Sequence, residues 1–257
     1  MDERGESLEL KSKRSRILYE ITALVVILMI ASGLLTFFFV NAAFKRMVDK
    51  SIDRVVEEQA ATLDSGLKYL GAREAEAVLG DLSRLSMDEL LASTKASLET
   101  GKPSEFALNA ATRMKKLVED NVLGLDLILD VILEKSPIVP EDVVIVSTDD
   151  ALTMRRPPEV VIAAIAEAEA ENRTYMYLEG GLPEIGLEGE YLVSFYDMSE
   201  INPLFADHWG VHFVSMHEAV ASIEGFYGSE KTRATWIIAL IIGGSVLLVI
   251  VVTFFIL

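Results

Sequence analysis

Two uncharged stretches decide the architecture of this chain. Residues 21–40 read ITALVVILMIASGLLTFFFV, and residues 234–257 read ATWIIALIIGGSVLLVIVVTFFIL. A helix that rises 1.5 Å per residue needs about 20 apolar residues to cross the hydrocarbon core of a bilayer. A buried helix of that length, apolar on every side, is untypical of a small domain. Both stretches therefore predict membrane-spanning helices, which we place at residues 17–40 and 234–257.

The first stretch has one alternative interpretation as a secretory signal. Val40-Asn41-Ala42 resembles a small-residue cleavage site. The apolar region of a signal peptide is usually about 7–15 residues long, however, so 20 bulky residues favour a retained membrane anchor.

The charge of the chain lies between these stretches. The 257 residues include 23 Lys and Arg against 40 Asp and Glu, a net charge of −17, yet 51% are hydrophobic and the mean hydropathy is +0.35. Residues 41–233 hold 18 of the basic and 35 of the acidic side chains. Nucleic acid is not expected as a partner, because binding it requires a basic surface. The chain has no Cys, which excludes disulfides, thiolate metal sites and cysteine nucleophiles.

Basic residues on both sides of the first span give a divided prediction of topology. Four precede it directly: Lys11, Lys13, Arg14 and Arg16. Four follow it: Lys45, Arg46, Lys50 and Arg54. Long domains cross the membrane largely regardless of charge, so the short tail counts for more. We expect a two-pass protein of the cell membrane, in contact with lipid, with residues 1–16 as a cytoplasmic tail and residues 41–233 as an extracytoplasmic domain.

The first half of that domain, residues 41–135, is predicted to be helical. Apolar residues at helical spacing continue the first span without a Pro as far as Gly66, Gly71 or Gly80. Ser86-Met87-Asp88-Glu89 is typical of a capping box, and Gly101-Lys102-Pro103 is expected to end the helix that it begins. A further helix is predicted from Ser104 to about Leu133, bent at Gly124, and no strand is expected before residue 134.

The second half, residues 136–233, is predicted to contain the sheet. Strand patterns occur at residues 142–148, 174–179, 190–197 and 209–216. Pro157-Pro158 begins a helix that Asn172 ends, and residues 217–233 form a final helix into the second span. The Gly-rich segment 180–189 is suited to a hairpin connection. Sequential strands with hairpin links predict an antiparallel sheet in an α+β fold.

This arrangement resembles the Cache family of PAS-like extracytoplasmic sensor domains. The resemblance rests on the long helix leaving the first span and on four segments: VVIVSTDD at 143–150, YLVSF at 191–195, WGVHFVSM at 209–216 and EAVASIEGFY at 218–227. It implies a sensor region of a chemoreceptor or histidine kinase that binds a small-molecule ligand. It also implies a HAMP linker and a signalling module after the second span. Because the sequence ends at Leu257, we expect that output in a longer protein or in a cytoplasmic partner.

No pattern predicts an enzyme, a cofactor or a metal site. The chain lacks the nucleophile elbow, the metalloprotease helix motif, the P-loop and the dinucleotide fingerprint. Its three His residues fall within ten positions, at His208, His212 and His217, but strand geometry separates them. We expect ordinary strand-end histidines rather than ligands of a metal ion.

The candidate ligand-binding residues come from the predicted sheet and from one basic pair. Tyr175 and Tyr177 share a strand face, Ser194 and Tyr196 share another with Tyr191 opposite, and one of the histidines, His212, is taken to line the pocket. Arg155 and Arg156 interrupt an otherwise acidic region, since residues 117–230 hold 4 basic and 23 acidic side chains. Such an Arg can bind a carboxylate ligand with both of its nitrogens. The alternative is that the tyrosines are half-buried core and the arginines balance local acids.

Small residues in the spans suggest how the chain packs in a membrane. Ala239, Gly243, Gly244 and Ser245 form a small-residue face on the second span, and Ser32 and Thr36 form one on the first. These faces predict a homodimer with four transmembrane helices, or else packing of one span on the other within a single chain. The sequence thus predicts a membrane-bound, non-enzymatic sensor. The alternative is an accessory or scaffold protein whose acidic domain binds another protein.

Overall fold

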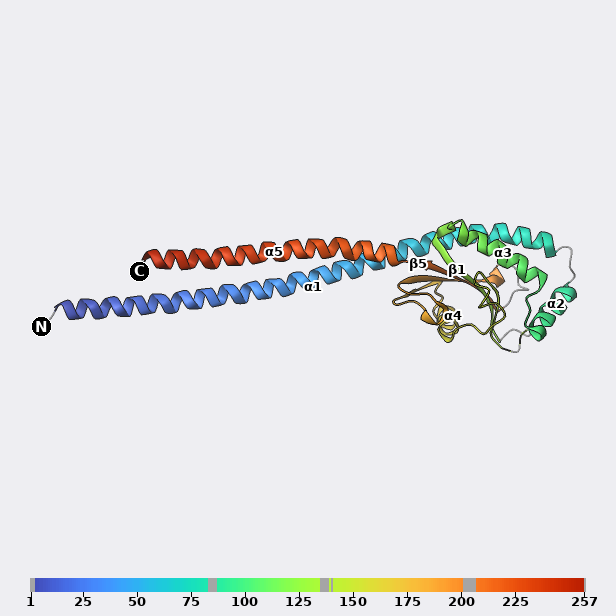
Figure 1. Cartoon of the computed structure of the whole chain (residues 1–257), viewed down its shortest axis with the longest axis horizontal. Coiled ribbons are helices and arrows are strands. Elements are labelled where there is room, and N and C mark those ends of the chain that lie inside the picture. The colour runs from blue at the N-terminus through green and yellow to red at the C-terminus, as the bar shows by residue number, and fades with distance from the viewer. Residues whose placement is uncertain (1–2, 83–86, 135–138, 140, 201–206, 257) are drawn as a thin grey trace. The chain divides into compact units, whose positions relative to one another are not determined.

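The computed structural model describes residues 3–82, 87–134, 139, 141–200 and 207–256, which form an α+β fold (Figure 1). Its helices are α1 (Glu3–Leu82), α2 (Met87–Thr100), α3 (Glu105–Glu119), α4 (Glu159–Glu171) and α5 (His217–Ile256). Its strands are β1 (Leu125–Ile132), β2 (Val143–Ser147), β3 (Tyr175–Leu178), β4 (Tyr191–Asp197) and β5 (His208–Ser215). Short 3₁₀ turns occupy Val122–Gly124, Pro183–Ile185 and Met198–Glu200.

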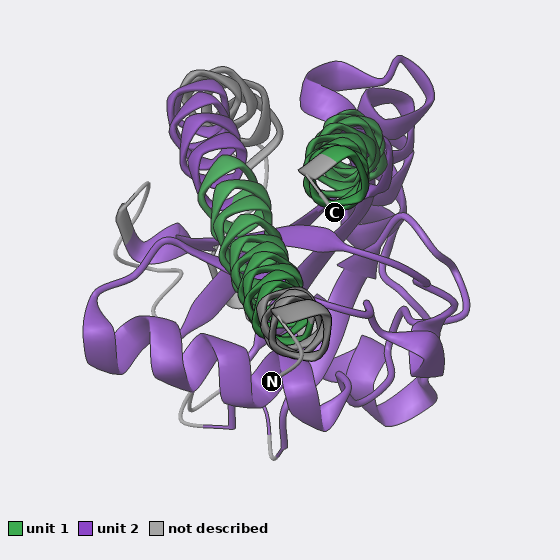
Figure 2. Ribbon diagram, turned by 90° about the vertical axis from the view of Figure 1, so that its left-hand side faces the viewer, with its two compact units in different colours: residues 1–52, 221–257 green, residues 53–220 purple. Residues whose placement is uncertain are grey.

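The chain divides into two compact units (Figure 2). Residues 1–52 and 221–257 form unit 1, which we call the helix pair. Residues 53–220 form unit 2, which we call the sheet unit.

The sheet has five strands in the order β2-β1-β5-β4-β3, and every neighbouring pair is antiparallel. The first and last strands of the sequence, β1 and β5, therefore lie side by side within the sheet. The edges are β2 and β3. This arrangement confirms the antiparallel α+β prediction and the four strands expected after residue 136.

The fifth strand corrects the prediction that residues 104–133 are helical. α3 ends at Glu119, and the left-handed conformations of Asn121 (φ 50°) and Leu123 (φ 57°) turn the chain into β1. Most side chains of β1 are buried on both faces of the sheet. Such a continuous apolar run has no alternation, so its periodicity resembles that of a buried helix. The predicted helical half, residues 41–135, thus ends at Glu119.

Helices cover both faces of this sheet (Figure 1). On one face, Val161, Ile165 and Ala168 of α4 pack into a core with the inward residues of β1, β2, β4 and β5. On the other face, Ala107 and Ala111 of α3 pack against Val146 of β2. The part of α1 inside the sheet unit also buries an apolar stripe, made up of Val56, Ala60, Leu63 and Leu67. We call the side of the sheet that α4 covers the α4 face, and the side that α3 covers the α3 face.

Several predicted element boundaries are confirmed. α4 follows Pro157-Pro158 and ends at Asn172, which is left-handed (φ 53°) and donates its N–H to the carbonyl of Ala168. α1 continues from the first apolar stretch as predicted, but Gly66, Gly71 and Gly80 do not end it, because the helix runs on to Leu82. α2 ends at Thr100, before the left-handed Gly101. Ser86 of the predicted capping box lies outside the described residues.

The connection between β3 and β4 requires glycine at one position in particular. Gly181 has a φ of +67°, and a Cβ there would collide with the carbonyl oxygen of Leu187 and lie 2.9 Å from that of Gly189. Gly186 has a similar φ of +77°, but open space surrounds it. Both glycines permit a backbone conformation that L-residues disfavour, and Gly181 also permits a close backbone approach.

We expect Gly181→Ala to destabilise the sheet unit more than Gly186→Ala does. The second substitution costs only the left-handed conformation, about 1–2 kcal/mol, while the first adds a collision with backbone oxygens. Urea unfolding of the two variants measures the difference. Equal losses of stability would mean that the 179–190 connection does not pack as described.

In the helix pair, α1 and α5 run antiparallel, and three contacts give their register. The hydroxyls of Thr22 and Thr253 lie 3.1 Å apart. Ile242 fills the place that a side chain on Gly33 would take. Beyond the apolar stretch, the hydroxyls of Ser51 and Tyr227 lie 3.1 Å apart. Along the apolar stretch, residue n of α1 thus lies opposite about residue 275 − n of α5, and at Ser51 the register has shifted by three residues. This register sets the stretches 21–40 and 234–257 side by side.

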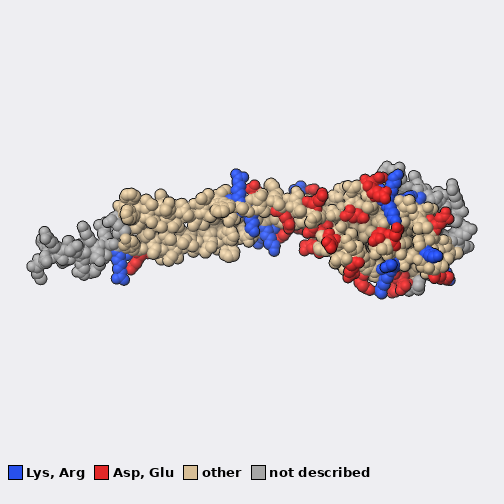
Figure 3. All heavy atoms as spheres, in the orientation of Figure 1, with Lys and Arg blue, Asp and Glu red and all other residues tan. Residues whose placement is uncertain are grey.

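Both helices are long and apolar enough to cross a membrane, and their apolar side chains point outward. Figure 3 shows this part of the helix pair as a surface without Lys, Arg, Asp or Glu. Ser32, Gly33 and Thr36 line an open cleft of about 300 Å³ with Ile242 and Ser245 of α5. Of the small residues in the first span, Gly33 is buried against the second span of the same chain, while Ser32 and Thr36 stay exposed at the cleft.

The small-residue face of the second span is used only in part. A Cβ on Gly243 or Gly244 would meet nothing within 4 Å among the described residues. These two glycines leave a flat face on α5, and the homodimer stays a prediction.

Candidate functional site

Polar side chains gather on the α3 face of the sheet, around a glycine of β5. Strand alternation places His208, Gly210 and His212 on one face of β5. The register pairs Gly210 with Asp130 of β1 on one side and with Tyr196 of β4 on the other. Paired residues on neighbouring strands point to the same face. Asp130 and Tyr196 therefore flank the position that lacks a side chain.

A second row of polar residues lies beside the first. Tyr175 of β3 pairs with Ser194 of β4, which pairs with His212 of β5. Ser194 is buried, and its hydroxyl donates a hydrogen bond of 3.3 Å to the carbonyl of Thr174. The two rows together form a polar patch on the α3 face of the sheet.

The imidazole of His212 leans over Gly210. A Cβ on Gly210 would lie 3.1 Å from Cε1 of His212 and 3.8 Å from the sulfur of Met198. The glycine thus makes room for the ring, and a larger residue there would push the ring away. This position sets the imidazole over the residue that pairs with Asp130.

Two buried atoms of the patch have unused hydrogen-bonding capacity. Oδ1 of Asp130 and Nδ1 of His212 are inaccessible to solvent and find no hydrogen-bond partner among the described residues. Leaving such an atom unpaired costs about 1–3 kcal/mol, so most buried polar atoms are bonded to protein or water. A bound molecule with polar groups gains free energy by satisfying these atoms.

Burial also sets the ionisation of the patch. It raises the pKa of Asp130 from 3.8 to about 7 and lowers the pKa of His208 and of His212 from 6.5 to about 4. For His212, a hydrogen bond with the backbone of Ser194 acts in the opposite direction. Between about pH 5 and pH 6, the folded protein therefore holds a protonated carboxyl group beside neutral imidazoles. The patch then offers both donors and acceptors without a net charge.

The structure brings together five of the predicted ligand-binding residues. Tyr175, Tyr177, Ser194, Tyr196 and His212 all lie on the α3 face. Tyr191 lies on the α4 face, within the hydrophobic core. The Tyr191 hydroxyl bonds to the carboxylate of Asp126, and burial, followed by that charge, raises the pKa of the tyrosine.

The two arginines lie elsewhere. Arg155 and Arg156 are exposed, and the carbonyl of Arg155 accepts a hydrogen bond of 2.9 Å from the amide of Val144 in the edge strand β2. Arg156 pairs with Glu159 at 2.8 Å. The tyrosines of β3 are at the opposite edge, four strand spacings or about 19 Å away. Arg156 thus balances a local acid, as the alternative prediction has it, and the structure does not bring either arginine to the tyrosines.

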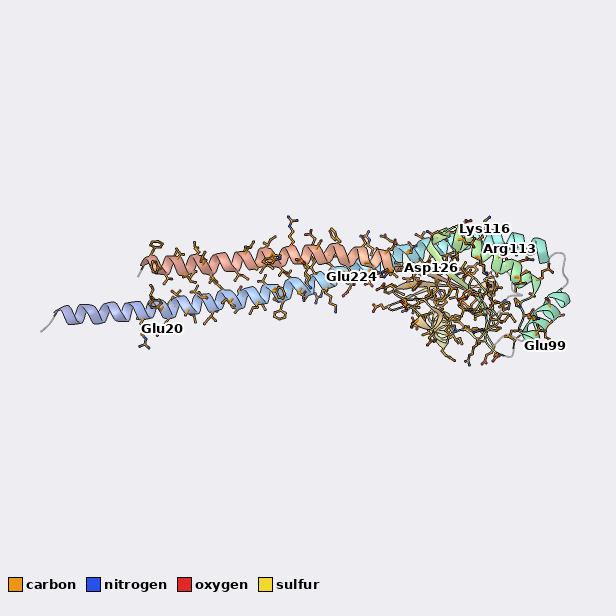
Figure 4. The ribbon with its side chains drawn as sticks, viewed as in Figure 1. Glu20, Glu99, Arg113, Lys116, Asp126 and Glu224 are labelled. Atoms are coloured by element: carbon orange, nitrogen blue, oxygen red, sulfur yellow. The ribbon has the colours of Figure 1, made fainter. Side chains whose placement is uncertain are left out.

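Sequence reasoning missed Asp130, because it assigned that residue to a helix. The signal that could have found it is the acidic residue within the apolar run LDLILDVI. A carboxyl group in a segment buried on both faces must be neutral, paired or bound to a ligand. Above the same half of the sheet, α3 carries the half-buried Arg113 and the exposed Lys116 (Figure 4). No three metal-ligating side chains of the described residues converge as an ion would require.

Comparison with known proteins finds no family, no curated protein and no solved structure that matches this chain. The polar patch is therefore interpreted from its own geometry.

Proposed function

We propose that this chain is a two-span membrane sensor whose sheet unit is a PAS-like domain of the Cache type. The observation that carries the proposal is the continuity between sheet and span. Only Met216 separates β5, a strand inside the sheet, from α5, and α5 continues as one helix to Ile256. A change in the position of β5 therefore reaches the second span without passing through a flexible linker.

The fold supports this proposal. In a PAS-like sheet the first and last strands lie side by side at the centre and the hairpin strands lie at the edge, as in the order β2-β1-β5-β4-β3. A long helix that leaves the first span and lies along the domain is the other feature of the resemblance, and α1 has this form. With the basic tail before the first span on the cytoplasmic side, the sheet unit would lie outside the cytoplasm.

The polar patch is the proposed ligand site. It offers the carboxyl of Asp130, the imidazole of His212 and the hydroxyl of Tyr196 on one face, with its net charge near zero between about pH 5 and pH 6. These groups suit a small uncharged molecule that has adjacent hydrogen-bond donors and acceptors. Two of the residues around it, Gly210 and His212, belong to β5. A ligand that binds one position of β5 more tightly would shift the equilibrium towards that position.

Ligand binding can be tested by thermal unfolding of the full chain in lipid nanodiscs. The probes are a panel of sugars, nucleosides, amides, amino acids and dicarboxylates. We expect one uncharged class to raise Tm by several degrees, as saturating ligand does for a domain of this size. His212→Phe should abolish the shift, and Arg173→Gln, an exposed residue paired with Glu171, should retain it. Stabilisation by dicarboxylates that survives His212→Phe would contradict the proposed site.

Transmission of ligand binding from the sheet unit to the membrane-spanning helices needs a separate measurement. Because the chain has no Cys, spin labels can be placed on cysteines introduced at exposed Met47 of α1 and Phe226 of α5. Bound ligand is expected to change their separation by about 1–2 Å, the usual size of a helix shift. A bound ligand that leaves this distance unchanged contradicts a sensor. No hit in the panel, with a protein that co-purifies, would favour the accessory or scaffold alternative.

A further inference from the structure

Basic side chains gather at one level of the helix pair. They are Lys45, Arg46 and Lys50 of α1 and Lys231 and Arg233 of α5, which we call the basic collar. The register of the pair sets residues 42–50 of α1 beside residues 225–233 of α5. This band is about 12 Å deep at 1.5 Å per residue. It holds five basic and two acidic side chains, in a chain whose net charge is −17.

The collar lies directly beyond the apolar surface, at the end towards the sheet unit in the sequence. Trp236 is 67% exposed, and the register places it at the level of residue 39. Tyr19 is 60% exposed near the other end of the apolar stretch. The two levels are 20 residues or about 30 Å apart, which is the thickness of the hydrocarbon core. Amphipathic rings favour the two boundaries of that core, so the collar falls at the depth of lipid headgroups.

No ion pair among the described residues neutralises the charges of the collar. All five side chains are exposed. None forms an ion pair with a carboxylate of the described residues, although Arg16, Arg54 and Lys68 on the same helix do. Asp49 and Glu230 also lie in the band, but two acidic side chains leave a net positive charge against five basic ones. Figure 3 shows the blue side chains of this level next to the uncharged surface.

We propose that the basic collar binds the phosphate groups of anionic phospholipids in the leaflet that faces the sheet unit. The inference rests on the proposed membrane insertion. Ammonium and guanidinium groups donate charge-assisted hydrogen bonds to phosphate, and each basic residue near the surface strengthens the attraction to anionic lipid. The collar selects headgroups by charge at a fixed depth, while the apolar surface contacts acyl chains of any lipid.

Quenching of Trp236 by brominated lipids tests this proposal. The full chain with Trp209→Phe, which leaves Trp236 as the sole tryptophan, is reconstituted in vesicles of phosphatidylcholine. Brominated phosphatidylglycerol or brominated phosphatidylcholine is included at the same fraction. We expect brominated phosphatidylglycerol to quench Trp236 roughly two- to fivefold more efficiently than brominated phosphatidylcholine does. We call this the quenching ratio. Salt at about 0.5 M should reduce the ratio towards one, because it screens the attraction.

Two double variants distinguish an effect of the collar from an effect of the net charge of the protein. Lys231→Gln with Arg233→Gln removes the two basic residues nearest to Trp236 in the sequence and should bring the ratio close to one. Lys102→Gln with Lys116→Gln removes the same charge from exposed positions of the sheet unit and should leave the ratio unchanged. Inorganic phosphate at millimolar concentration should not compete.

Four results would overturn the proposal or the insertion on which it rests. Equal quenching by the two lipids, or a ratio that the Lys231/Arg233 variant retains, contradicts lipid selection by the collar. Competition by inorganic phosphate would mean a free-anion site instead. If neither brominated lipid quenches Trp236, membrane insertion itself is contradicted. This outcome distinguishes a failure of the proposed insertion from a failure of lipid selection by the collar.

Discussion

Replacing Asp130 by Asn is expected to stabilise the sheet unit at neutral pH and to leave its stability unchanged near pH 4. Burial raises the pKa of this carboxyl group from 3.8 to about 7, so the folded protein keeps a proton that the unfolded chain releases near pH 4. Between these two values, each pH unit lowers the stability of the native protein by about 1.4 kcal/mol. Asn has the same shape and no charge to bury. Its advantage should reach on the order of 4 kcal/mol above pH 7.

His212→Gln should show the opposite dependence on pH. Burial lowers the pKa of this imidazole from 6.5 to about 4, so its contribution is fully present above pH 6.5 and is lost as the pH falls to 4. Relative to the native protein, the Gln variant should therefore gain stability in acid, by about 1.4 kcal/mol per pH unit over that range. Neighbouring His208, whose pKa burial also lowers, stays in both proteins and cancels in the difference.

Urea unfolding of the full chain between pH 4 and pH 8 measures both differences. Trp236→Phe in every protein leaves Trp209, which packs against the core of the α4 face, as the reporter of the sheet unit. An Asp130→Asn variant that is less stable than the native protein at pH 7 would contradict the prediction. It would mean that the folded protein stabilises the ionised carboxylate, for example through an ion pair with a protonated imidazole.

Phe213→Ala should cost about 3–5 kcal/mol of the free energy of unfolding of the sheet unit. Phe213 is fully buried on β5, and its register neighbours on the α4 face are Leu127 of β1 and Val193 of β4. Truncation leaves a cavity between these strands and α4, where close packing prevents collapse. Because β5 leads into α5, we expect the same variant to weaken any response of α5 to ligand.

The matched control for this substitution is Phe226→Ala on α5. Phe226 is 62% exposed and contacts only the edge of Tyr227 in the ring pairs of the described residues. Its truncation should change the stability of the sheet unit by no more than about 0.5 kcal/mol. A similar loss for both variants would show that Phe213 is not part of a packed core.

The sequence by itself determined the elements that carry strong local signals. The apolar stretches, the helix between Pro158 and Asn172, and four strands with turn residues at their ends depend on neighbours in the sequence. The Gly-rich connection at 180–189 belongs to the same class, since φ > 0 is a local requirement. For these segments, local preference and tertiary structure agree.

Only the tertiary structure decided β1 and the polar patch. The run LDLILDVI fits a buried helix or a buried strand equally well, and its pairing with β5, some 80 residues later, selects the strand. That pairing sets Asp130 beside Gly210 and His212, while Tyr196 comes from a third strand. The register between distant strands is fixed by which faces are buried across the whole sheet, and no local pattern of residues contains it.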